Sequence, residues 1–250
     1  MRSVPASFWN IYEALVDPIP AKIAVISVSQ GRRWTYVEAE TGVGMALSDT
    51  SGSCLGYENS ENISLRELAS WIRSWDFSKA SIGLAAVNAF WNQPSACDRN
   101  FAPTSRIERD SLSDWVSMVY AGKSVLTVGH FSFVDKLAES CKLQILERNP
   151  GPGDLPDTAC EVLLPSQDLV LITAATLVNK SFVRLSQLVQ GDAILLGPST
   201  PLCPEFCSHG MTQLSGLLVR DSESLMRHIR TGASREVFKG SLTKPMAVRL

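Results

Sequence analysis

Residues 168–200, DLVLITAATLVNKSFVRLSQLVQGDAILLGPST, contain two short apolar runs separated by a segment with helical spacing. The runs DLVLIT (168–173) and DAILLG (192–197) are rich in Leu, Ile and Val and do not alternate with polar residues. Strands of this kind are typical of a parallel sheet that helices cover on both faces. The order strand, helix, strand therefore predicts part of an α/β domain.

The same alternation extends through the second half of the chain. Further strands are expected at 124–129 (SVLTVG), 142–147 (KLQILE) and 216–219 (GLLV), and a helix at 133–141 (FVDKLAESC). Short apolar strands that alternate with helices predict a Rossmann-like, doubly wound, mainly parallel sheet. We assign this domain to residues 122–250.

The first part of the chain has a different pattern. KIAVISVSQGRRWTYVEAE (22–40) forms two β-rich runs around Gln30-Gly31, and GVGMALSD (42–49) is a third, so a small antiparallel sheet is expected. Helices are expected on either side of it in the sequence, at 7–20, 64–76 and 78–93. These segments indicate a small α+β domain at 1–95, followed by a linker and helix at 96–121.

Composition excludes several classes of protein. The 23 Lys and Arg against 25 Asp and Glu leave a net charge of -2, so neither nucleic acid nor a membrane surface is an expected partner. No apolar run approaches the roughly 20 residues that cross a bilayer, and the first residues lack the pattern of a secretion signal. The six cysteines are spread out, which favours free thiols. We expect a cytoplasmic protein.

Polar groups follow the predicted strands at their carboxyl ends, where ligands bind in open α/β sheets. His130 and Glu147 follow two strands that commonly neighbour one another in this fold, and they offer the imidazole and carboxylate donors that suit a transition metal. The loop Gly197, Pro198, Ser199 and Thr200 follows a third strand and offers amides and hydroxyls to an anion.

Other readings of these strand ends remain open. Thr173, Thr176 and Asp221 are also placed to cap helices, and Asn179 to face solvent within its helix. Glu147 lies near the spacing of a ribose-binding acid, but GHFSFV (129–134) lacks the further glycines that a pyrophosphate requires, so no NAD site is expected.

Cys203 and Cys207 are four residues apart, which is not the close pairing of structural zinc sites.

Taken in order, the motifs resemble a known family, described as "putative heavy-metal chelation" and long classed as a domain of unknown function. They are ASIGLAAVNAFWN, VGHFSFV, ILERNPGPGDLPDTACEVLLP, DLVLITAATLVNKS and LLGPSTPLCPEFCSHG. The resemblance implies a small domain similar to the N-terminal domain of enolase, packed on a Rossmann-like domain, with a site in the cleft between them. The matching positions are Asn88, His130, Phe131, Glu147, Asp154, Thr173, 197–201 and His209-Gly210.

These observations lead to one principal hypothesis and two alternatives. The first is a metal-handling protein with His130 and Glu147 as metal ligands, and with a small anionic ligand in the same cleft. The other residues expected to bind this ligand are Asn88, Phe131, Thr173, Gly197, Pro198, Ser199 and Thr200. The alternatives are an enzyme for a small phosphorylated or carboxylated metabolite, with His130 as general acid or base oriented by Glu147, and a noncatalytic sensor or scaffold. We allow for a homo-oligomer in each case.

Overall fold

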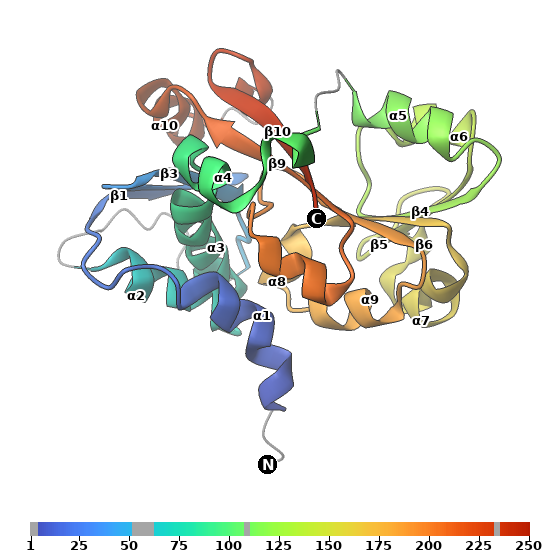
Figure 1. The fold of residues 1–250 in the computed structure, drawn as a ribbon, viewed down its shortest axis with the longest axis horizontal. Coiled ribbons are helices and arrows are strands. Elements are labelled where there is room, and N and C mark those ends of the chain that lie inside the picture. Colours follow the sequence, from blue (N-terminus) through green and yellow to red (C-terminus); the bar gives the residue numbers. More distant parts are fainter. Residues whose placement is uncertain (1–4, 52–62, 108–110, 233–235) are drawn as a thin grey trace.

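The computed structural model describes residues 5–51, 63–107, 111–232 and 236–250, and it contains two sheets (Figure 1). The smaller sheet is antiparallel, as predicted, in the order β1 (Val25–Gln30), β2 (Trp34–Ala39) and β3 (Gly42–Leu47). The helices that come before and after it in the sequence are α1 (Ala6–Val16), α2 (Leu65–Ser70) and α3 (Phe77–Trp91).

The larger sheet has seven strands in the order β10-β9-β8-β7-β4-β5-β6. They are β4 (Ser124–Val128), β5 (Lys142–Glu147), β6 (Leu155–Pro156), β7 (Leu169–Thr173), β8 (Asp192–Leu196), β9 (Gln213–Val219) and β10 (Thr243–Arg249). All neighbouring pairs are parallel except β9 and β10. The predicted α/β fold with a mainly parallel sheet is therefore confirmed.

Helices cover both faces of this sheet. In Figure 1, α5 (Leu112–Val119) and α6 (Val134–Ala138) lie above the strands, and α7 (Cys160–Leu163) and α9 (Phe182–Leu188) lie below them. Alternate residues of β7 enter different cores: Leu169 and Leu171 pack toward α5 and α6, whereas Val170 and Ile172 face the other helices. Burial on both faces explains why the strand sequences are continuously apolar.

The chain reverses direction across the sheet between β4 and β7. From β4 it continues outward to β5 and β6 on one side, and then returns to β7, β8 and β9 on the other. In open α/β sheets, this switch point leaves a crevice outside the carboxyl ends of the strands. Two strands flank it: residues 129–131 follow β4, and Thr173 is the last residue of β7.

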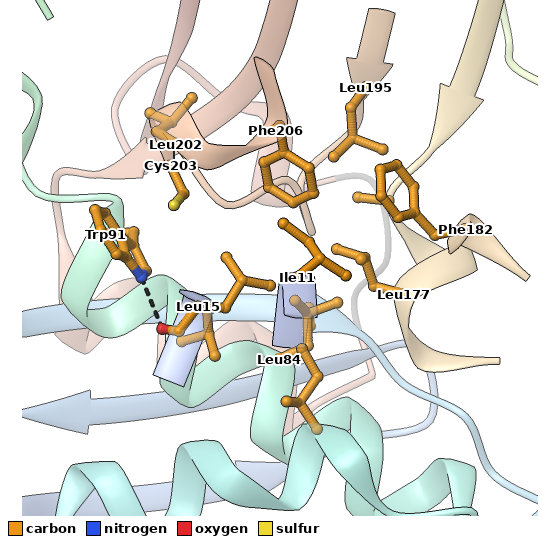
Figure 2. Close-up of a cluster of buried hydrophobic side chains, with 14 of the residues drawn as sticks. Ile11, Leu15, Leu84, Trp91, Leu177, Phe182, Leu195, Leu202, Cys203 and Phe206 are labelled. Carbon is orange, nitrogen blue, oxygen red and sulfur yellow. Dashed lines mark hydrogen bonds between the residues drawn. The ribbon is translucent and has the colours of Figure 1, made fainter. Parts of the chain in front are cut away.

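One hydrophobic core runs through both sheets' layers (Figure 2). Ile11 and Leu15 of α1 pack with Leu84 of α3 and with Phe182 and Phe206 from the second half of the chain. The indole nitrogen of Trp91 also donates to the carbonyl of Leu15 at 2.9 Å. The two halves thus share buried apolar surface, which stabilises their arrangement.

The C-terminal part of the chain returns to the small sheet. The helix α10 (Ser222–Arg230) places Leu225 and Ile229 in a cluster with Trp34, Tyr36 and the neighbouring residues of that sheet. As predicted for capping, the Asp221 carboxylate accepts from the amide of Ser224 at the start of α10. The small sheet is therefore packed between α3 and α10. The division at 1–95, 96–121 and 122–250 stays a prediction.

Three elements were not predicted from the sequence, namely β6, β10 and α4 (Pro94–Asn100). The segment with helical spacing between β7 and β8, residues 176–189, predicts a single helix. That prediction is wrong, because the structure has two helices there, α8 (Ala175–Val178) and α9. Lys180 has a φ of 69° between them, a left-handed conformation that no α-helix continues through.

Two further expectations concern cysteines and membranes. Cys141 is buried and Cys160 is half-buried. Five cysteines in the described ranges are free thiols, and Cys54 lies outside those ranges. Among the described residues, no helix is both long enough and apolar enough to span a bilayer.

Candidate functional site

A cleft of about 1790 Å³ lies at the carboxyl ends of β4, β5, β7 and β8. Its lining also includes Arg33, Trp34 and Leu47 from the small sheet. Most of the predicted site residues line it, namely His130, Phe131, Glu147, Thr173, Gly197, Pro198 and Ser199. Asn88 and Thr200 do not belong to the lining.

The His130 imidazole is held from one side by a buried carboxylate. Its Nδ1 lies 3.0 Å from Oδ1 and 3.2 Å from Oδ2 of Asp154, whose side chain is only 4% exposed. The amide of Gly151 also donates to Oδ2 of Asp154 at 3.0 Å, which fixes the carboxylate. Because an ionised carboxylate only accepts, we assign the ring proton to Nδ1, and Nε2 is then free to accept a proton or a metal ion.

Glu147 reaches the same strand ends but contacts the main chain. Its Oε1 accepts from the amide of His130 at 2.7 Å and its Oε2 accepts from the amide of Arg148 at 3.0 Å. It therefore holds the end of β5 to the residue that follows β4. The group that contacts the imidazole is Asp154, so the orienting role that we predicted for Glu147 belongs to Asp154.

Asp154 was a family match in the sequence without an assigned role. It lies in NPGPGD (149–154), and Gly153, with a φ of 90°, turns the chain directly before it. The signal available in the sequence was this glycine-rich turn ending in an acid. Nothing in the spacing indicated that the acid would return to His130.

The protein alone offers few metal ligands at this place. Among the described residues, no three His, Cys, Asp or Glu side chains are grouped so that they could hold a metal ion. His130 Nε2 is one suitable donor, and the Glu147 oxygens have lone pairs beyond those used by the two amides. Zinc takes four ligands in most protein sites, so at least two would have to come from another molecule.

The loop after β8 has little amide capacity for an anion. The amide of Gly197 donates to Ser215 and that of Thr200 donates to Gly197, while Pro198 has none. The Ser199 hydroxyl accepts from the amide of Leu47 at 2.8 Å and retains its own proton. The Ser199 hydroxyl is the side-chain group of this loop at the cleft, since the Thr200 hydroxyl, which lacks a partner among the described residues, is fully buried.

Asn88 and Asn92 of α3 hold this loop from behind. Asn88 Nδ2 donates to the carbonyls of Met45 and Ser199, and Asn92 Nδ2 donates to that of Thr200. Oδ1 of Asn92 accepts from the amide of Leu202. Asn88 therefore positions the loop through the main chain, and the Thr200 side chain is buried beside it.

Two other predicted residues shape the floor of the cleft. Phe131 stacks on Phe133, with ring centroids 5.3 Å apart and the planes inclined by 5°. Gly129, with a φ of 109°, lies so close to Thr173 that a Cβ on the glycine would be 3.2 Å from its methyl group. The Thr173 hydroxyl accepts from the amide of Ala175 at 3.4 Å, consistent with the capping alternative.

Known proteins resemble the chain over its whole length. A family model described as "Putative heavy-metal chelation", DUF364, matches residues 112–248, and a second with the same description, DUF4213, matches residues 12–91. The chain belongs to the DUF364 family. Among curated proteins, none matches it.

Solved structures of DUF364 proteins share the fold. A protein of unknown function from Desulfitobacterium hafniense DCB-2 is 31% identical, with 98% of this chain and 99% of that chain covered and a TM-score of 0.87. Another, from Pyrococcus horikoshii, is 20% identical with a TM-score of 0.75, over 97% of this chain and 99% of that one. The second likeness is evidence for the fold alone.

Some DUF364 motif positions lie away from the cleft lining. Gly210, with a φ of 77°, ends a short helical turn at Pro204–His209, and His209 Nδ1 lies 3.0 Å from the Ser208 hydroxyl. Cys203 is buried in the core of Figure 2, and burial raises the pKa of its thiol to about 12. Cys203 therefore behaves as a small apolar residue.

Further charged residues of the cleft, to which the sequence analysis gave no role, pair with one another. Arg184 donates two hydrogen bonds to the Glu161 carboxylate, and Arg148 Nε lies 3.8 Å from an oxygen of Asp157. Cys160 lies beside Glu161 in the same wall. Asp157, Cys160 and Glu161 follow β6, which the sequence pattern did not reveal.

Lys180 is buried between two residues of the cleft lining, Asn179 and Ser181. Asn179, for which facing solvent was one of the open alternatives, accepts from the amide and hydroxyl of Ser181 through Oδ1. The Lys180 Nζ donates to the carbonyl of Val178 at 2.7 Å and lies over the rings of Tyr12 and Phe77. Burial lowers the pKa of Lys180 to about 8.

The lowered pKa of Lys180 predicts that the protein becomes more stable above pH 8. The unfolded chain keeps this lysine protonated up to about pH 10.4, so between these values the unfolded state binds more protons and the free energy of unfolding rises with pH. Between pH 8 and 9.5 we expect a gain of about 1–2 kcal/mol relative to Lys180→Met, measured by urea unfolding. The free energy of unfolding of Lys22→Met, at an exposed site, should depend on pH as that of the wild type does. If the free energy of unfolding of Lys180→Met rises with pH as much as that of the wild type, the lowered pKa of Lys180 is wrong.

Proposed function

We propose that the protein binds a transition or heavy-metal ion together with a small anionic organic ligand in the cleft. The main support is the His130–Asp154 pair, which presents a free Nε2 at the switch point of the sheet. A histidine oriented by a carboxylate through its other nitrogen is the usual arrangement of a metal-binding histidine. The family description, heavy-metal chelation, agrees with this coarse function.

The donor set supports a metal held jointly with an organic ligand. His130 would supply an imidazole nitrogen and Glu147 a carboxylate oxygen, and a chelating ligand would supply the remaining donors. The cleft, at about 1790 Å³, has room for both, since pockets for small organic ligands commonly measure about 300–1,000 Å³. A bound metal would act there as a Lewis acid on its ligand.

The test measures metal and anion on the same protein. The full chain, purified without a histidine tag and treated with EDTA, is dialysed against Zn²⁺ with and without radiolabelled citrate. We expect about one zinc and one citrate retained per chain, with the zinc measured by mass spectrometry. If citrate strips the zinc and is not itself retained, the joint site is wrong. If Co²⁺, Ni²⁺, Cu²⁺, Zn²⁺ and Cd²⁺ all fail to bind, the metal function is wrong.

The same pair of side chains supports a second candidate function. A neutral imidazole with Nδ1 bound to a carboxylate can take a proton through Nε2, as in general base catalysis. The protein would then act on a phosphorylated or carboxylated metabolite without a tightly bound metal. A thermal-shift screen separates the two, because stabilisation by a metabolite that persists in excess EDTA favours the enzyme.

A further inference from the structure

Three arginines line the cleft, and they differ in their partners. Arg148 and Arg184, both from the large-sheet half, lie next to the carboxylates of Asp157 and Glu161. Arg33 comes from the small sheet's side of the cleft, and within the described part of the chain no carboxylate lies in ion-pair distance of it. Among the three arginines that line the cleft, Arg33 is therefore the one whose charge no carboxylate of the described structure neutralises.

The main chain holds Arg33 in a fixed relation to the loop after β8. The amide of Gly31 donates to the carbonyl of Trp34 and closes the turn between β1 and β2. The carbonyl of Arg33 accepts from the amide of Ser48 at 2.9 Å. The amide of the preceding residue, Leu47, donates to the Ser199 hydroxyl. Two successive amides at the end of β3 therefore connect the main chain of Arg33 with the loop after β8.

The exposed Arg33 side chain also lies against a buried aromatic ring. The Arg33 guanidinium lies 5.9 Å from the ring centroid of Trp34, which is 4% exposed and meets Phe238 edge to face. An aromatic face attracts the cation without neutralising its charge. An arginine that already lies against a ring loses less entropy on binding than one without such a contact, and its planar group matches the two oxygens of a carboxylate or phosphate.

We propose that Arg33 binds the anionic group, a carboxylate or a phosphate, of the ligand that enters the cleft. This inference rests on the proposed function, since it names the residue that recognises the organic part. The four carboxylates of the cleft lining, Asp135, Glu147, Asp157 and Glu161, all lie on the large-sheet side. The amides of His130 and Arg148 hold the Glu147 carboxylate on that side. His130 and Glu147 would therefore bind the metal from the large sheet, and Arg33 would bind the anionic group of the ligand from the small sheet.

The experiment compares Arg33→Gln with Arg32→Gln, its matched control. Arg32 is the adjacent exposed arginine and does not line the cleft. Binding of Zn²⁺, citrate and inorganic phosphate to the full chain is measured by calorimetry, for each anion with and without zinc. We expect Arg33→Gln to weaken anion binding about 10- to 100-fold and to leave the affinity for zinc alone within about twofold. Arg32→Gln should match the wild type, and Arg33→Lys should be intermediate.

The outcomes separate this inference from the proposed function. If both glutamine variants bind the anions as the wild type does, Arg33 is not the anion-binding residue, and the metal and anion site stands. If the wild type binds zinc and neither anion, both the role of Arg33 and the joint binding of metal and anion are overturned, and the metal site alone stands. If it binds neither zinc nor an anion, the proposed function fails as well. Unchanged circular dichroism and melting temperature of Arg33→Gln identify any loss as a loss of contact.

Discussion

Zinc binding should fall at least 100-fold when His130 is replaced by asparagine, because the substitution removes the only imidazole donor of the cleft lining in the described structure. Asparagine still offers an amide that can meet the buried Asp154 carboxylate, so the fold should be preserved. The measurement is equilibrium dialysis of EDTA-treated protein against Zn²⁺, with citrate present, and mass spectrometry of the retained metal.

Two further variants test whether zinc binds at His130. Asp154→Asn keeps the shape of the carboxylate but loses its charge, and we expect about 10- to 100-fold weaker zinc binding, as is typical when the partner of a metal-binding histidine is changed. His209→Asn changes a histidine outside the cleft lining and should bind zinc as the wild type does. Equal loss in the His130 and His209 variants would contradict a site at His130.

Replacing Gly44 with alanine should strongly destabilise the folded protein. A Cβ at Gly44 would lie 2.1 Å from the carbonyl oxygen of Ala85 and 2.1 Å from the amide nitrogen of Ala89, both in the backbone of α3. Neither atom can rotate away, so β3 and α3 must separate. We expect the free energy of unfolding to fall by about 3 kcal/mol or more, measured by urea denaturation.

Gly240→Ala is the control for this prediction. A Cβ at Gly240 would meet no atom within 4 Å, and its stability change should stay within about 0.5 kcal/mol. Since α3 also carries Asn88 and Asn92, which hold the loop after β8, Gly44→Ala should weaken anion binding too. A stable Gly44→Ala variant would show that β3 and α3 do not pack as closely as described.

The large sheet and its switch point were predictable from the sequence because their signals are local. Runs such as DLVLIT and SVLTVG consist mainly of apolar residues without a regular alternation with charged ones, as burial on both faces requires. The residues directly after such strands must lie at one edge of the sheet, which is why His130, Glu147 and Thr173 were found together.

The features of the site that could not be predicted depend on contacts between residues far apart in the sequence. Asp154 reaches His130 across 24 positions through a glycine-rich turn, and no periodicity reports such a return. The main chain of Arg33 is connected to the loop after β8 by one hydrogen bond within the small sheet, from the Ser48 amide to the Arg33 carbonyl, and one between the sheets, from the Leu47 amide to the Ser199 hydroxyl. Lys180 interrupts a segment whose apolar spacing is helical on both sides, so the break follows from tertiary packing.

The most direct test of the metal site is anomalous diffraction at the zinc edge from a crystal of the full chain soaked with Zn²⁺ and citrate. We predict a peak about 2.0–2.1 Å from Nε2 of His130, with citrate density completing its coordination. A peak only at surface groups such as His209 or Cys207, with none beside His130, would contradict the account.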